Sequence, residues 1–424
     1  MRLVRHEGIP NAPPTAKAPR MKFAHYLVTT ALLTGAAAGA LNVSGVEIIL
    51  TRVPEGGLQP QSLVGSDGTL HLAYFRGDPK AGDLFYARRA TGSGEFTKPI
   101  RVNAQPGAAI AIGTIRGAQM ALGKNGGVHV AWNGSGKAST HPGAPMLYTR
   151  LNDNGTAFEP ERDVMTFTGG LDGGGSVAAD EKGNVYVAWH GSASATEGKE
   201  TERAVFVAIS TNEGRTFERE QRVNPEPTGA CGCCGLKAFA APDGNLYLLY
   251  RAARGGVDRD AVLLASSDRG KTFRSLYVHP WKATTCPMSS AWLGSAGTNG
   301  TIAAWETMGR VWFSTIDRRE TGGRRSEVGG RISARPLTSD LRPPVAVAPA
   351  GGGQKHPVAV ANASGETLLV WAEGTGWEKG GTVAWQLFDS QGKPTETVGR
   401  KEGLPVWSFA AAVARRDGDF EIIY

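Results

Sequence analysis

The stretch Val185-Tyr186-Val187-Ala188-Trp189 decides the fold of this chain, because its pattern returns six more times. It follows the turn residues Gly183-Asn184 and alternates with the two-residue period of a strand. We therefore expect it to be the second strand of an antiparallel hairpin. Segments of the same form are Leu70–Tyr74, Val128–Trp132, Leu246–Tyr250, Thr301–Trp305, Thr367–Trp371 and Phe420–Tyr424. Their terminal aromatic residues are about 53 to 66 residues apart, which leaves room for four strands in each unit.

Seven units of about 55 residues are typical of a β-propeller built from four-stranded antiparallel blades. We predict an all-β fold in which residues 41–424 form one propeller domain, with seven blades preferred and six as the alternative. The seventh unit has only two strands, and the strand 46–51 precedes the first unit. We expect this N-terminal strand to complete the last blade and close the ring, because closure removes exposed strand edges.

Composition supports a strand-rich fold and excludes some partners. Glycine accounts for 58 of the 424 residues, and each interior helical glycine costs about 1 kcal/mol relative to alanine. The formal net charge is +7, but five basic residues and one acidic residue in the first forty contribute +4 of it. The chain has no run of basic residues interleaved with aromatic ones, so we do not expect it to bind nucleic acid.

The N-terminal residues 1–40 have the features of an export signal after an over-extended start. An apolar stretch runs from Phe23 to Ala40 and ends in Ala38-Gly39-Ala40, a small-x-small cleavage pattern. A membrane anchor is the alternative, but the stretch is short and rich in Ala and Gly. We predict a cleaved signal, a mature chain without a membrane span, and a periplasmic or secreted location in which disulfides can form.

The four cysteines are expected to meet on one face of the ring. Cys231-Gly-Cys233-Cys234 precedes the first strand of the fourth unit, and Cys286-Pro287 precedes that of the fifth. First strands are innermost in a propeller, so these loops should lie near the axis. Two structural disulfides are one interpretation, for example Cys231 or Cys234 with Cys286, and a vicinal Cys233–Cys234 bond is possible. A thiolate site for Cu(I) or Zn(II) is a second interpretation, and a redox-active or unpaired arrangement is a third.

Other polar residues should share that face, because strand-two ends and strand-one starts lie on the same side of a blade. Strand-two ends contribute Arg76, Asn133, His190, Arg251, Glu306 and Glu373, and strand-one starts contribute Arg116, Asp172 and His356. Loops after the second strand add Asp78, His141, Arg254, Asp258, Arg259 and Asp260. Arginines and carboxylates around an axis suit an anionic or polyhydroxylated ligand such as carbohydrate. They can equally be solvated groups or structural ion pairs.

Two eight-residue motifs carry a family resemblance. Ser210–Phe217 (STNEGRTF) and Ser266–Phe273 (SSDRGKTF) resemble the Asp-box of sialidase-like (BNR-repeat) propellers, Ser/Thr-x-Asp-x-Gly-x-Thr-Trp/Phe, and 153–158 is a degenerate copy. The resemblance implies a propeller with these turns between strands three and four, away from the active face. Sialidases also hold their substrate with an arginine triad, and here Gln59 stands where the first arginine is expected. The Cys-x-Cys-Cys and Cys-Pro pair is similar to an exported bacterial subgroup of such propellers.

Three function classes remain. A glycan-active enzyme would use two carboxylates about 5–10 Å apart, with Glu306 and one of Asp258, Asp260 or Glu373 as candidates. A polysaccharide lyase would instead use His190 as base. In either enzyme the ligand would be held by Arg76, Arg116, Arg251, Arg259 and His356. The second class is a non-catalytic propeller that binds a glycan or a protein. The third is a metal-binding or redox propeller built on Cys231, Cys233, Cys234 and Cys286.

Overall fold

The structure is a computed structural model that describes residues 45–138, 143–193, 199–224, 227–297, 300–317, 341–347 and 353–424. The predicted export signal and the candidate His141 lie outside these residues. Within them, no helix has the length and apolar character needed to cross a membrane. The compact unit discussed below spans Val46–Tyr424.

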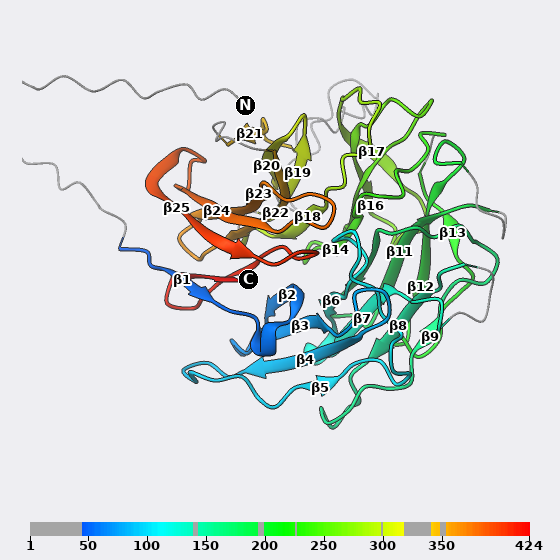
Figure 1. Ribbon diagram of the computed structural model, residues 1–424, viewed down its shortest axis with the longest axis horizontal. Coiled ribbons are helices and arrows are strands. Elements are labelled where there is room, and N and C mark those ends of the chain that lie inside the picture. The colour runs from blue at the N-terminus through cyan, green and yellow to red at the C-terminus, as the bar shows by residue number, and fades with distance from the viewer. Residues whose placement is uncertain are drawn as a thin grey trace, which may run out of the picture. The chain divides into compact units, whose positions relative to one another are not determined.

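The strands of the described residues form seven sheets, which are the seven blades of a β-propeller (Figure 1). The first three blades are β2(Leu58–Val64)-β3(Leu70–Arg76)-β4(Asp83–Arg89)-β5(Ile100–Arg101), β6(Gln119–Leu122)-β7(Val128–Asn133)-β8(Met146–Arg150)-β9(Arg162–Asp163) and β10(Gly175–Ala179)-β11(Val185–Gly191)-β12(Ala204–Ser210)-β13(Gln221–Arg222). Blades four to six are β14(Lys237–Ala240)-β15(Leu246–Arg251)-β16(Ala261–Ser266)-β17(Arg274–His279), β18(Ala291–Ser295)-β19(Gly300–Thr307)-β20(Arg310–Asp317)-β21(Val345–Ala346) and β22(Gln354–Ala361)-β23(Thr367–Glu373)-β24(Gly381–Phe388)-β25(Pro394–Leu404). The seventh blade is β26(Ala411–Ala414)-β27(Phe420–Ile423)-β1(Ile48–Thr51), and two short 3-10 turns are η1(Pro54–Gly56) and η2(Lys124–Gly126).

The first strands of the blades contact one another in cyclic order, from β2 through β6, β10, β14, β18 and β22 to β26 and back to β2. This order confirms a closed ring of seven blades. It also places the first strands around the axis, which is why residues just before them gather at its mouth.

The seventh blade closes the ring in a way that differs from the expected antiparallel meander. β1 pairs with β27 in parallel, with Ile48 opposite Phe420 and Thr51 opposite Ile423, and the blade has three strands. The cause is the direction of the chain. β1 continues directly into β2, so it must run as the fourth strand of a blade runs. In the seventh blade β1 lies beside β27, which is the second strand of that blade. Second and fourth strands of a blade run in the same direction, and β1 and β27 are therefore parallel.

The core lies between neighbouring blades and explains the repeated pattern. Each second strand is covered on both faces, and all seven residues of β11 are buried. Trp132 and Trp189 are fully buried in clusters that join blades one and two, and blades two and three. Burial of side chains of this size contributes on the order of 2–3 kcal/mol each, so the strand-two aromatics are major contributors to stability.

The two Asp-box turns lie between strands three and four, as the sequence predicts. Asn212 Oδ1 accepts a hydrogen bond from the Thr216 N–H at 3.0 Å, and Asp268 Oδ1 accepts one from the Thr272 N–H at 2.9 Å. Gly214 has φ +75°, and a Cβ there would lie 1.7 Å from the Tyr148 hydroxyl, so only glycine fits. These turns are on the opposite side of the ring from the cysteines.

Candidate functional site

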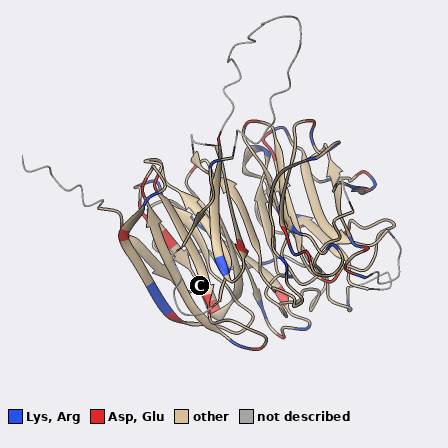
Figure 2. Cartoon of the chain, turned by 90° about the horizontal axis from the view of Figure 1, so that it is seen from above, with Lys and Arg blue, Asp and Glu red and all other residues tan. Residues whose placement is uncertain are grey.

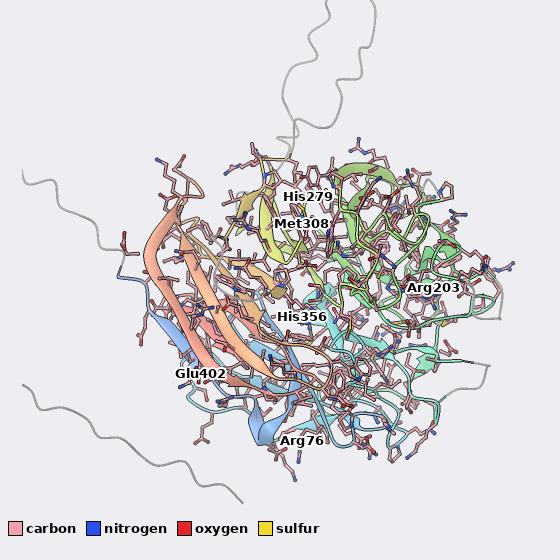
Figure 3. The ribbon with its side chains drawn as sticks, turned by 45° about the horizontal axis from the view of Figure 1, so that its top comes forward. Arg76, Arg203, His279, Met308, His356 and Glu402 are labelled. Carbon is pink, nitrogen blue, oxygen red and sulfur yellow. A yellow bond between two sulfur atoms is a disulfide. The ribbon has the colours of Figure 1, made fainter. Side chains whose placement is uncertain are left out.

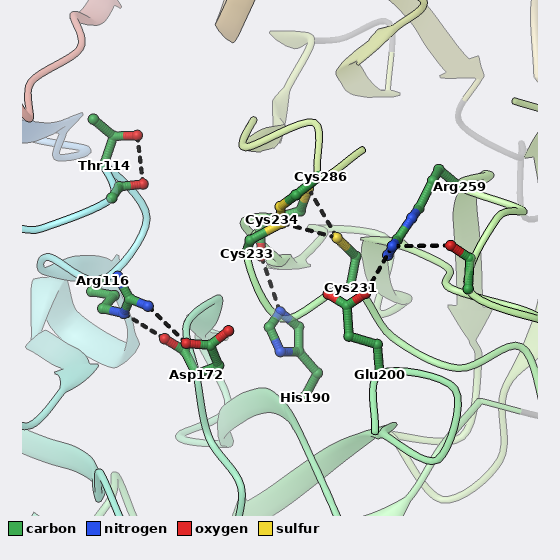
Figure 4. The surroundings of a disulfide bond; sticks show 12 residues. Thr114, Arg116, Asp172, His190, Glu200, Cys231, Cys233, Cys234, Arg259 and Cys286 are labelled. Carbon is green, nitrogen blue, oxygen red and sulfur yellow. Dashed lines mark hydrogen bonds and ion pairs between the residues drawn. A yellow bond between two sulfur atoms is a disulfide. The ribbon is translucent and has the colours of Figure 1, made fainter. Parts of the chain in front are cut away.

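The four cysteines meet where blades four and five adjoin, on the side formed by strand-two ends and strand-one starts (Figure 4). We call this side the cysteine face and the four residues the cysteine cluster. Cys233 and Cys286 form a disulfide with a Cα–Cα distance of 6.5 Å, whereas Cys231 and Cys234 are free thiols. The expected convergence is confirmed. The pairings of Cys231 or Cys234 with Cys286, and of Cys233 with Cys234, are wrong.

The sulfur atoms of the cysteine cluster are in mutual contact. The Cys231 Sγ lies 3.2 Å from the Cys233 Sγ and 3.5 Å from the Cys234 Sγ. Cys231, Cys233 and Cys234 have the spacing of a possible metal site. With the disulfide formed, two thiols remain, fewer than the four ligands that structural Zn(II) takes. Binding of Cu(I) or Zn(II) therefore stays a prediction for a state in which the disulfide is open.

Two glycines let the cysteine loop reach this position. A Cβ at Gly232 would lie 2.4 Å from a guanidinium nitrogen of Arg203 and 2.8 Å from a carboxylate oxygen of Asp172. Gly174, with φ +69°, packs directly against the His190 ring and the Cys234 carbonyl. The cysteine loop therefore packs closely against blade three and the loop before it, and this packing fixes the position of its backbone.

The charges around the cluster act differently on the two thiols. Burial disfavours ionisation of Cys234, but the hydrogen bond from Cys231, the charge of Arg251 and the Ser289 N–H together lower its pKa to about 7. The hydrogen bond to Cys234 and burial raise the pKa of the Cys231 thiol. The lower-pKa thiol, Cys234, is therefore the one that carries negative charge near neutral pH.

The predicted catalytic carboxylates have structural partners. Glu306 is buried, its Oε1 accepts from the Gly309 N–H at 2.8 Å, and its Oε2 lies 3.3 Å from Arg251 Nη2. Burial raises the pKa of Glu306, and the charge of Arg251 opposes this. Glu373, in blade six, pairs with Arg400 and accepts from the Trp371 indole N–H at 2.7 Å.

The loop candidates Asp258 and Asp260 organise the segment beside the cluster. Asp260 Oδ1 accepts from the Trp281 N–H at 2.9 Å, and Asp258 bridges to Arg254 and Lys282 through its backbone. The ring of Trp281 lies under the Arg251 guanidinium at 5.0 Å. A catalytic role for any of these carboxylates remains a prediction.

The two predicted histidines on this face are buried and neutral. His190 donates through Nε2 to the Cys234 carbonyl at 3.0 Å, and burial lowers its pKa to about 4. His356, near the axis (Figure 3), lies 3.1 Å from both the Thr114 and Ser290 hydroxyls, and burial lowers its pKa to about 3. Both rings anchor loops around the mouth of the ring.

The predicted ligand-binding arginines also have carboxylate partners. Arg116 pairs with Asp172 at 2.8 Å, Arg259 pairs with Glu200 at 2.8 Å, and Arg76 pairs with Glu55. Acidic and basic residues are mixed over the loops of the unit (Figure 2), which accords with this pairing. Structural ion pairs between segments of the ring therefore describe the observed contacts of these arginines.

Gln59, which stands where a sialidase arginine is expected, holds the ring together. Its Nε2 donates to the Ala111 and Trp407 carbonyls at 2.5 and 2.8 Å, and its Oε1 accepts from the Gly117 N–H at 2.9 Å. These contacts tie blade one to the loops before β6 and β26. The side chain is buried and satisfied, so it supports the position of Trp407 rather than facing a ligand.

Sequence reasoning missed an exposed apolar surface on the cysteine face. Four of the exposed large apolar side chains lie in its loops: Val257, Met308, Trp377 and Val406. Trp377 is 60% exposed and stands edge-to-face on Trp407, with ring centroids 4.7 Å apart. The available signal was the segment Gly374-Thr-Gly-Trp377, which follows a strand-two end directly.

Sequence reasoning also missed a lysine in the axial channel. The seven inner strands line a cavity of about 380 Å³, and its lining includes Lys237 and Trp292. Lys237 Nζ donates to Gln119 Oε1 at 3.1 Å and lies 4.7 Å from the Trp292 ring centroid. Burial lowers the pKa of Lys237 to about 8.

Comparison with known proteins gives likeness at the level of solved structures. No family model matches the chain, and no curated protein matches it. The chain is similar to the Hadza microbial sialidase Hz136, with 14% identity over 81% of this chain and 74% of that one and a TM-score of 0.47. It is also similar to an α-L-arabinanase of Penicillium chrysogenum (13% identity, 80% and 95% covered, TM-score 0.46) and to the polysaccharide lyase Uly1 (11%, 79% and 78%, 0.43). Sequence identities of 11–14% do not assign an activity to this chain. The structure shows its fold, which is a seven-bladed β-propeller.

Proposed function

We propose that this propeller binds carbohydrate on the cysteine face, with Trp377 as the stacking platform. The observation that supports it is a tryptophan that is exposed and yet held in place. Trp377 packs on Trp407, and the Trp407 carbonyl is held by Gln59. A fixed indole face offers the apolar C–H face of a sugar a large contact area at little cost in side-chain entropy.

Binding fits the contacts of this face better than glycan turnover does. A hydrolase needs one carboxyl free to donate a proton and a second free to attack or to activate water. Glu306 and Glu373 each accept a hydrogen bond and pair with an arginine. The polar groups around Trp377, including the exposed Glu378 and Lys379, are available to hydroxyl groups of a bound sugar.

The test is titration of the full chain with a panel of neutral and acidic oligosaccharides by calorimetry. For the sugar that binds best, we expect Trp377→Ala to weaken affinity about ten-fold, equivalent to about 1.4 kcal/mol, and Trp377→Phe to retain most of it. Met308→Ala is the matched control, because Met308 is exposed on the same face at 56%. Equal affinity of Trp377→Ala and the parent chain, or no binding across the panel, would refute the proposal. Turnover that Glu306→Gln abolishes would establish an enzyme instead.

We also propose that the chain is exported and loses residues 1–40. The apolar stretch ending in Ala38-Gly39-Ala40 supports this, and a disulfide between Cys233 and Cys286 suits an oxidising compartment. Expressed in a bacterial host, the chain should appear in the periplasm or medium with the intact mass of residues 41–424. The variant Leu33→Arg, in which a charge interrupts the apolar stretch, should stay in the cytosol and keep residues 1–40. Recovery of the parent chain uncleaved from the cytosol would contradict export.

A further inference from the structure

The cysteine cluster combines a formed disulfide with two thiols in contact with it. The Cys231 Sγ touches the disulfide sulfur of Cys233 at 3.2 Å and the thiol sulfur of Cys234 at 3.5 Å. Reacting atoms held about 3–3.5 Å apart are at the separation from which an intramolecular reaction proceeds. Cys231 is therefore the central sulfur of the cluster, with a disulfide on one side and a thiol on the other.

Exposure to solvent differs sharply between the two pairs. Cys231 and Cys234 are 0% and 1% exposed, Cys233 is partly buried, and Cys286 is exposed. A thiol from outside can therefore reach the disulfide at Cys286, whereas Cys231 and Cys234 are closed to solvent and lie in contact with the disulfide. The four sulfur atoms thus form a continuous series of contacts from the exposed Cys286, through Cys233, to the buried Cys231 and Cys234.

The buried guanidinium of Arg259 lies beside the cysteine cluster and has N–H groups that are not yet hydrogen-bonded within the described part of the chain. Arg259 pairs with Glu200 through Nη2, but its buried Nε and Nη1 have no hydrogen-bond partner among the described residues. Its charge acts on both Cys231 and Cys234, and Figure 4 shows it directed toward Cys231. Arginine beside a cysteine stabilises the thiolate that exchange requires.

We propose that the cysteine cluster is a thiol–disulfide exchange centre, in which the disulfide migrates between the exposed pair Cys233–Cys286 and the buried pair Cys231–Cys234. This activity goes beyond carbohydrate binding and does not depend on it. Its external partner is a thiol-bearing molecule that reaches Cys286, such as a cysteine-containing chain.

The steps balance without an added oxidant. The Cys231 thiol passes its proton to the Cys234 thiolate, which already accepts its hydrogen bond at 3.5 Å, and attacks the Cys233 sulfur. A Cys231–Cys233 bond forms, the electron pair of the broken bond leaves on Cys286, and the proton on Cys234 passes to the Cys286 thiolate. The Cys234 thiolate then attacks the Cys231 sulfur, and Cys233 leaves as a thiolate. One disulfide is consumed and one is formed; the proton of Cys231 passes by way of Cys234 to Cys286, and Cys233 takes up one proton from solvent. In the reverse direction the exposed disulfide is restored, and it can then oxidise two external thiols through a mixed disulfide on Cys286.

Tryptic peptides make the position of the disulfide directly readable. Cleavage after Arg222 and Lys237 places Cys231, Cys233 and Cys234 on one peptide, and cleavage after Lys282 and Arg310 places Cys286 on another. A Cys233–Cys286 bond joins the two peptides. A Cys231–Cys234 bond leaves them separate, with Cys286 free.

The experiment incubates the folded full chain with N-ethylmaleimide, without reductant, and follows the two peptides by mass spectrometry over time. We expect Cys286 to become labelled while an internal disulfide appears in the other peptide, because labelling traps each molecule in which the disulfide has migrated. Cys231→Ser, which lacks the central sulfur, should label Cys286 at least ten-fold more slowly. Cys234→Ser lacks the second nucleophile and the group that accepts the Cys231 proton, so its Cys286 should label more slowly than in the parent chain and with a Cys231–Cys233 bond in the other peptide.

Circular dichroism and thermal melts establish that the variants are folded. Two peptides that stay joined in the folded parent chain would overturn the proposal, as would equal labelling of Cys286 in the parent and in Cys231→Ser. Metal analysis provides a further decisive result. About one equivalent of copper or zinc, with all four cysteines reduced in the purified chain, would show a metal site and overturn the exchange centre.

Discussion

Lowering the pH from 7 to 5 should remove several kcal/mol from the free energy of unfolding, because buried histidines are held in neutral form and three of them have strongly lowered pKa values. Burial lowers the pKa of His129 and of His190 to about 4, and that of His356 to about 3. In the unfolded chain each titrates near 6.5. Between these values the unfolded chain binds protons that the folded chain does not, so stability falls as the pH falls through this window. Each histidine contributes about 2 kcal/mol to the loss at pH 5.

Neighbouring charges do not reverse this effect. Arg150 and Glu213 act on His129 with opposite signs, as Arg203 and Asp172 do on His190, and Lys355 further disfavours protonation of His356. Carboxylates add their own acid sensitivity at lower pH. Burial raises the pKa of Glu220, but hydrogen bonds from Thr166, Phe167 and Thr168 outweigh this and lower it. Burial also lowers the pKa of His71 and of His279, so both add to the loss in the same direction. The window between pH 6.5 and 5 therefore reports the histidines.

Denaturant unfolding at pH 7, 6 and 5 tests this expectation. The slope near pH 5 should correspond to an uptake of at least about three protons on unfolding, the share of His129, His190 and His356. His129→Gln, which can keep a hydrogen bond to the Tyr148 hydroxyl, should remove about one proton from that slope. A free energy of unfolding that is flat between pH 7 and 5 would show that these rings are not buried as described.

Gly174→Ala should destabilise the fold and open the cysteine loop. A Cβ at this position would lie 2.2 Å from His190 Nε2 and 2.5 Å from the Cys234 carbonyl oxygen, so it would displace a backbone group and break the hydrogen bond between them. Overpacking costs about 1–3 kcal/mol, and the broken hydrogen bond about 1 kcal/mol more. We also expect the buried thiols of Cys231 and Cys234 to react about ten-fold faster with a thiol reagent.

Gly374→Ala is a closely matched control. Gly374 has the same φ of +69°, but a Cβ there would meet nothing within 4 Å. Both substitutions therefore introduce the same left-handed backbone strain, of about 1–2 kcal/mol, and only the first adds a collision. Denaturant unfolding and thiol kinetics of the two variants isolate the packing effect. Equal losses of stability in the two variants would show that the cysteine loop does not pack on Gly174.

The second strands, the seven blades and the meeting of the cysteines on one face could all be predicted from the sequence. Each depends on a local pattern, namely alternation, an aromatic terminus and turn glycines, that is repeated along the chain. The pairing of Cys233 with Cys286 could not be predicted, because adjacent cysteines differ only in the direction of their side chains. That direction follows from the packing of Gly232 against Arg203 and Asp172, which lie on blade three and the loop before it.

The candidate site shows the same division. The sequence predicted that Glu306, Glu373, Arg116 and Arg259 would lie on the cysteine face, but it could not predict that each has a partner of opposite charge. Trp377 and Lys237 were missed, because the exposure or burial of a single residue does not change the periodic pattern of apolar residues in the sequence. Such contacts join residues that are far apart in the chain.

The amino-acid sequence by itself determined the repeating unit and the face on which the cysteines meet, and it favoured seven blades over six, since these follow from short-range patterns of side chains and turns. Only the tertiary structure decided which cysteines are bonded, that β1 closes the ring in parallel, and that the charged residues of this face are largely paired. The physical reason is that these features depend on the directions in which non-neighbouring segments approach one another, and no local pattern of residues encodes those directions.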